Sequence, residues 1–68
     1  MSAAEITNEI CQRIGGNSLI AISIRNSLTN ITMSDNDVVC EIKEMAEDNF
    51  TAIEKMLGTE LTNRIINF

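Results

Sequence analysis

The stretch SDNDVVCEIKEMAEDNFTAIEKMLG, residues 34–58, decides the fold that we predict for this chain. It opens with Ser34 and two aspartates, and such hydroxyl and carboxylate groups favour the positive end of a helix dipole. A mostly apolar seam follows at 4-3-4-3-4 spacing, formed by Val38, Ile42, Met45, Asn49, Ala52 and Met56, with Ile53 on its flank. This periodicity predicts one amphipathic helix of about 20 residues that ends at Gly58.

Asn49 lies in the middle of the seam and leaves two interpretations open. In a continuous helix its amide would pair with that of a second chain, because a buried Asn at a coiled-coil core position fixes register and oligomeric state. In the alternative, Asp48 or Asn49 caps a new helix and the segment is broken there. We take the continuous helix as the prediction.

Two segments before this stretch are also predicted to be helical. Residues 3–14 follow Ser2 and Glu5, which have capping-box spacing, and stop at the glycine pair 15–16. Residues 18–33 fit both a strand and a helix by periodicity. Their length, their start at a serine and the lack of a second strand favour the helix.

A short last helix is predicted after Thr59, whose hydroxyl would cap it, with Glu60 and Arg64 spaced to form an ion pair. Its apolar face would consist of Leu61, Ile65 and Phe68. The predicted fold class is therefore all-α. It is a single small helical domain, residues 1–68, of three to four helices with one long amphipathic third helix.

We expect the long helix to join two chains into a dimeric helical bundle. A chain of 68 residues buries only about 60% of the surface that its unfolded form exposes, so its own core is thin. At about 1.5 Å per residue the helix is over 30 Å long, more than so small a globule needs. The predicted dimer interface consists of Val38, Ile42, Met45, Asn49, Ile53 and Met56.

The composition excludes most catalytic and metal-binding chemistry. The chain has no His, Trp, Tyr or Pro and only two Cys. Cys11 and Cys40 form no CxxC motif and have no His to activate them, so we expect both to be filler side chains. A disulfide between them stays open. We predict that the protein is not an enzyme and that it binds no cofactor and no metal.

Ten acidic residues against five basic ones give a net charge of −5, which disfavours direct binding of nucleic acid. Four carboxylates spaced 4, 3 and 4 form a stripe on one helix edge: Asp37, Glu41, Glu44 and Asp48. We expect this stripe to bind a basic surface of another protein, although a merely solvated face is the alternative. The predicted function is a protein-binding module. It would be an inhibitor or regulatory adaptor, encoded by a phage or a bacterium, that occludes a surface of its partner.

Two other functions are alternatives. The segment Gly15-Gly16-Asn17-Ser18-Leu19 resembles the attachment site of acyl and peptidyl carrier proteins. This resemblance implies phosphopantetheine on Ser18, but only 17 residues precede that serine, too few for the helix and loop that carrier domains place there. A helix-turn-helix regulator is the third possibility, in which Arg25 would be the only cation of the recognition helix.

The sequence also predicts the surroundings of the protein. Residues 1–5 have neither the basic nor the apolar region of a signal peptide. No stretch approaches the roughly 18 consecutive apolar residues that would span a bilayer. We therefore expect a cytoplasmic protein without membrane contact, whose cysteines stay reduced.

Overall fold

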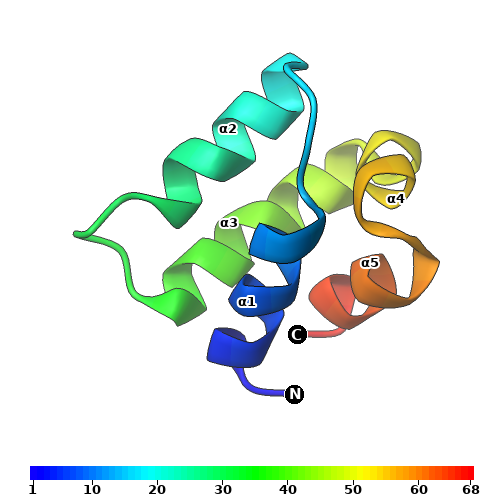
Figure 1. Cartoon of the computed structure of the whole chain (residues 1–68). Helices are drawn as coiled ribbons and strands as arrows, with labels where there is room; N and C mark the ends of the chain where they lie inside the picture. The colour runs from blue at the N-terminus through cyan, green and yellow to red at the C-terminus, as the bar shows by residue number, and fades with distance from the viewer.

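The computed structural model describes residues 1–68 and contains five α-helices and no strands. The helices are α1 (Ala3–Arg13), α2 (Leu19–Leu28), α3 (Asp35–Asp48), α4 (Phe50–Leu57) and α5 (Thr59–Ile66) (Figure 1). Each of the other four helices contacts α3. None of the five is both long and apolar enough to cross a bilayer. The all-α prediction is confirmed, with five helices in place of three to four.

The prediction of one continuous helix is wrong, because the helix is interrupted at Asn49. Its backbone has φ −137° and ψ 54°, outside the helical region. The Asn49 N–H donates to the Met45 carbonyl at 2.8 Å and closes α3, and the Asn49 carbonyl accepts from the Ile53 N–H at 3.1 Å and opens α4. The alternative prediction gave the position of the break, but the Asn49 side chain makes no capping hydrogen bond.

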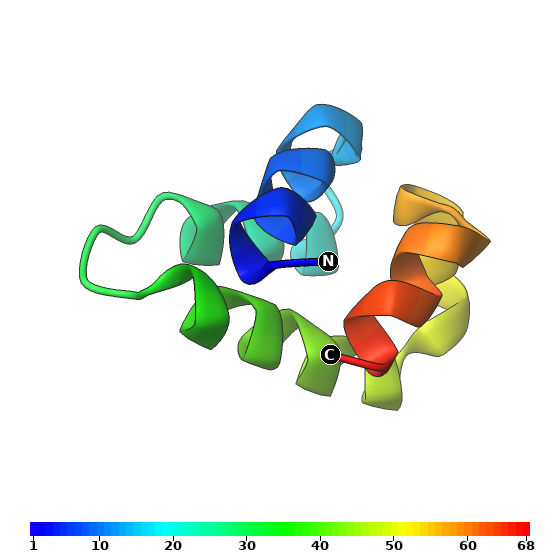
Figure 2. The ribbon, with the colours of Figure 1, turned by 90° about the horizontal axis from the view of Figure 1, so that it is seen from below.

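The break follows from the size of the molecule. A straight helix over residues 35–57 would be about 35 Å long, whereas the longest extent of the structure is 27 Å. Its last turns would project beyond the other helices and leave Ile53 and Leu57 in water. The break instead turns α4 back, so that α4 contacts α5 and α1 and both side chains are buried. Figure 2 shows α4 and α5 rising together from the end of α3.

One apolar core draws side chains from all five helices. Its buried members are Ala3, Ile6, Ile10, Ile24, Val38, Val39, Ile42, Ala46, Ile53, Leu57, Leu61 and Ile65. The molecule exposes 4084 Å², close to the value of about 4,250 Å² expected of a compact monomer of this mass. The single chain therefore encloses its own core.

The residues predicted to form a dimer interface belong mostly to this core. Val38, Ile42 and Ile53 are buried within the chain, while Met45 and Met56 are half-buried and packed against the core. Asn49 is exposed at the break and not inside an apolar seam. The seam is thus covered by the chain's own helices and is not free to bind a second copy. A homodimer stays a prediction, but without this interface.

The second helix is shorter than predicted. It begins after Ser18 as expected but ends at Leu28 and not at residue 33. The Asn30 side-chain oxygen accepts hydrogen bonds from the Thr32 N–H at 3.0 Å and the Thr32 hydroxyl at 2.6 Å. This local turn competes with the helix. Ile31, which the helical periodicity placed on the apolar side, is 99% exposed in the turn.

The capping box predicted at the first helix is confirmed. The Ser2 hydroxyl accepts from the Glu5 N–H at 3.2 Å, and the Ser2 N–H donates to the Glu5 carboxylate at 3.2 Å. The hydrogen bonds from the Ser2 N–H and hydroxyl lower the pKa of Glu5 below its ordinary value. They favour the ionised carboxylate at the positive end of the helix dipole.

The last helix differs from its prediction in two details. Thr59 is not its cap, because the cap position is Gly58, with φ +85°, and the Thr59 hydroxyl donates instead to the Glu54 carboxylate at 3.1 Å. Leu61 and Ile65 are buried as predicted. Phe68 lies beyond the helix and is 40% exposed, because the chain leaves the helical path after Ile66.

Comparing a capped helix start at Ser34 with the uncapped start at Asn49 tests the structure of the break. The Ser34 hydroxyl accepts from the Asp37 N–H at 3.2 Å, so Ser34→Ala should lower the free energy of unfolding by about 1 kcal/mol. Asn49→Ala removes no capping bond and should change it by less than about 0.5 kcal/mol. Urea denaturation followed by circular dichroism measures both. A loss for Asn49→Ala as large as that for Ser34→Ala would contradict the uncapped break.

Candidate functional site

The net charge of the protein is carried by one helix, α3. The 14 residues of α3 include six carboxylates and one lysine, a formal charge of −5 that equals the net charge of the whole chain. The remaining residues have four acidic and four basic side chains and are neutral in sum. The negative field of the molecule is therefore strongest at α3.

The outward face of α3 brings three of the four predicted carboxylates together. Asp37, Glu44 and Asp48 are exposed and, at the helical repeat of 3.6 residues, lie opposite the buried Val39 and Ala46. We call this surface the acidic face. No three of its carboxylates lie close enough together to hold a metal ion.

Glu41, the fourth predicted residue, lies at the edge of the acidic face that meets α2. Its side chain is half-buried, and its carboxylate lies 3.0 Å from the hydroxyl of the buried Ser27 on α2. That hydroxyl is also 3.2 Å from the Ser23 carbonyl. Because a charged acceptor gives the stronger bond, we assign Glu41 a part in holding α2 on α3 as well as a part of the surface charge.

The 4-3-4 spacing missed one member of the acidic face. Glu47 is exposed on α3 and lies about 100° around the helix from Asp48, so it falls outside the stripe but still faces solvent. A count of charges per predicted helix would have found it. Glu54 is not part of the acidic face, since it lies on α4 beyond the break.

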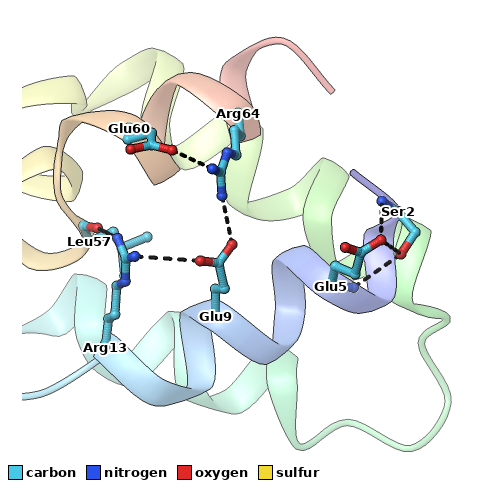
Figure 3. A network of polar contacts seen from close by, with 7 residues as sticks. All are labelled: Ser2, Glu5, Glu9, Arg13, Leu57, Glu60 and Arg64. Atoms are coloured by element: carbon cyan, nitrogen blue, oxygen red, sulfur yellow. Dashed lines mark hydrogen bonds and ion pairs between the residues drawn. The ribbon is translucent and has the colours of Figure 1, made fainter.

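Four of the eight charged residues outside α3 form ion pairs with one another (Figure 3). Arg64 on α5 donates to the Glu9 carboxylate of α1 at 2.8 Å and also pairs with Glu60, as the sequence predicted. Arg13 donates to the Leu57 carbonyl at the end of α4 at 3.0 Å and lies 3.5 Å from Glu9. These contacts fasten α1 to α4 and α5. The three helices together have four acidic and three basic residues, a formal charge of −1.

The helix after Ser18 has no free cation for DNA. The Arg25 guanidinium donates to the Gly16 carbonyl at 2.7 Å and to the Asn17 side-chain oxygen at 3.4 Å. It closes the loop between α1 and α2 and is half-buried there. Arg25 is thus used in the loop and is the only cation of α2, so the arrangement gives no support to the helix-turn-helix alternative.

Ser18 has a structural role that explains its position. Its hydroxyl accepts from the Ala21 N–H at 3.2 Å and caps α2. The residue is exposed. Phosphopantetheine on Ser18 stays a prediction, and the intact mass after expression with a phosphopantetheinyl transferase would test it.

A hollow lies where α3 meets α4, next to the acidic end of α3. It has a volume of about 600 Å³ and is lined by Glu47, Asp48, Asn49, Phe50, Thr51, Ala52 and Lys55. Phe50 is 39% exposed. The break at Asn49 thus places an accessible aromatic ring beside two carboxylates, which the continuous-helix prediction did not foresee.

The two cysteines lie on different helices. Both are free and exposed. Cys40 is on the outward side of α3, one turn after Asp37 and one turn before Glu44, whereas Cys11 is on α1. The disulfide that the sequence left open is absent. The reactivity of the Cys40 thiol can therefore report whether the acidic face is covered, and the Cys11 thiol serves as the control.

No protein-family model, curated protein or solved structure matches this chain. The geometry of the acidic face is therefore the basis for a functional assignment.

The exposure of the two thiols predicts their reactivity. Because Cys11 and Cys40 are both free and exposed, the folded protein should react with two equivalents of a thiol reagent such as dithionitrobenzoate without denaturant. The measurement is the absorbance of the released thiolate, with the urea-unfolded chain as reference. A folded protein that reacts with one equivalent or none would contradict the positions of these side chains.

Proposed function

We propose that this protein is a non-enzymatic protein-binding module that attaches to a basic surface of a partner protein through the acidic face of α3. It acts as a stoichiometric inhibitor or regulatory adaptor, of the kind that phages and bacteria encode, by covering that surface in the cytoplasm. The observation that carries the proposal is that α3 alone holds the entire net charge of the chain.

Charge on one face has a specific kinetic effect. Like charges that point the same way add to one local field, which draws a complementary surface and orients it during encounter. At physiological ionic strength such attraction is screened over about 8 Å, so exposed pairs add little to final affinity. The acidic face should therefore act mainly on the association rate.

Lasting affinity needs an apolar contact beside the charges, because buried aromatic side chains dominate the binding energy of most interfaces. Phe50 supplies one at the α3–α4 corner, where it is 39% exposed next to Glu47 and Asp48. We assign it the role of an anchor that enters an apolar pocket of the partner. Phe50 should act mainly on the dissociation rate.

Capture from the native host, followed by thiol footprinting, tests the proposal. The tagged protein is used to isolate its partner, which mass spectrometry identifies and which is then prepared in pure form. N-ethylmaleimide is applied to the complex and to the free protein, and the modified cysteines are located by mass. We expect the partner to protect Cys40 on the acidic face while Cys11 on α1 reacts at its free rate. Protection of Cys11 alone would contradict the proposal.

Rate measurements on the same pair separate charge from apolar contact. Neutralising the four predicted residues (Asp37→Asn, Glu41→Gln, Glu44→Gln and Asp48→Asn) should slow association several-fold, flatten its salt dependence and leave the helical circular dichroism intact. Phe50→Ser should instead raise the dissociation rate at least tenfold. The matched control Cys11→Ser/Cys40→Ser should change neither rate.

Association that is equally fast in the charge-neutral variant across a salt series would show that the acidic face is only a solvated surface.

A further inference from the structure

The outward face of α2 consists of uncharged residues only. Four of its residues are exposed and lie opposite the buried Ala21 and Ile24: Leu19, Ile22, Ser23 and Asn26. Leu19 is 83% exposed and Ile22 39%. In Figure 1, α2 runs along the edge of the molecule that lies opposite both chain termini. We call these four residues the neutral face.

The neutral face contains no charge, although solvent-exposed helix faces normally carry charged residues. From Ile14 to Ser34 the only charged residue is Arg25, and its guanidinium is bound to Gly16 and Asn17 inside the chain. A basic partner therefore finds no carboxylate here, and an acidic partner finds no free cation. The outward face of α2 therefore attracts neither a basic nor an acidic partner surface.

We infer that the neutral face binds a second copy of this chain, in a symmetric contact of α2 on α2. Two copies carry −5 each and repel one another most strongly through α3, so a contact between copies is least opposed on a face without charge. A two-fold axis brings the neutral face onto itself. Apolar side chains then cover apolar side chains, and the amide and hydroxyl of Asn26 and Ser23 find partners of the same kind.

The contact has the small size of a transient interface. One face of a ten-residue helix buries less than the roughly 1,200 Å² of a standard interface, so the dimer dissociates readily. It leaves the acidic face of both copies uncovered. The pair would then present two acidic faces to a partner with repeated basic sites and gain avidity from both. The dimer itself does not depend on the proposed function.

Sedimentation equilibrium of the purified protein tests this inference, from about 10 µM to about 1 mM and at about 0.05 M and 0.5 M salt. We expect the mass to rise from the monomer value of 7.5 kDa toward twice that value. The rise should occur at lower protein concentration in the higher salt, because salt screens the repulsion between the acidic copies. A constant monomer mass throughout, or weaker association in the higher salt, overturns the inference.

Substitutions locate the contact. Leu19→Glu and Ile22→Glu should each raise the dissociation constant more than tenfold, since a two-fold contact contains every substitution twice. Leu19 is the first residue of α2, where a carboxylate suits the helix dipole, so that variant should keep its fold. Phe68→Glu is the matched control, because Phe68 is 40% exposed beyond α5 and adds the same charge away from α2. Association that survives Leu19→Glu and Ile22→Glu, or that Phe68→Glu abolishes, overturns the assignment to α2.

Discussion

The enclosure of one apolar seam by a single short chain depends on the turn at Asn49. The seam residues of α3 need a cover, and α4 and α5 can supply it only if the chain turns back after Asp48. Asn49 leaves the helical region, but its N–H still closes α3 and its carbonyl opens α4. The backbone cost of the turn is therefore limited to the N–H groups of residues 50–52, which have no backbone acceptor. In return it buries Ile53 and Leu57 against α1 and α5. Without it, the same side chains would need a second molecule.

The distribution of charge follows from this enclosure. On the side of α1, α4 and α5, Arg64 and Arg13 tie helices together through their contacts with Glu9 and with the Leu57 carbonyl. On α3 the inward residues belong to the core, and the outward carboxylates take part in none of the ion pairs. The acidic face is therefore the surface on which the net charge of the chain is concentrated.

Local patterns in the sequence predicted what local chemistry controls. The capping box at Ser2, the caps at Ser18 and Ser34 and the position of the carboxylates around α3 all follow from short-range spacing. The sequence left the break at Asn49 open and favoured the continuous helix, because the 4-3-4 spacing continues through residue 49 and is the same for one helix or two. What decides between them is whether α1 and α5 can cover Ile53, and that contact is long-range. The exposure of Leu19 and the bond from Ser27 to Glu41 depend on neighbours that no local pattern contains.

Amide hydrogen exchange at the break tests the central claim most directly. The backbone N–H groups of Phe50, Thr51 and Ala52 begin α4 and have no backbone acceptor, whereas those of Asn49 and Ile53 are bonded to Met45 and Asn49. Exchange followed by NMR should therefore show rapid loss at residues 50–52 between two protected positions. Uniform slow exchange from residue 45 to residue 57 would mean that one continuous helix is present. The enclosed single-chain core would then be contradicted.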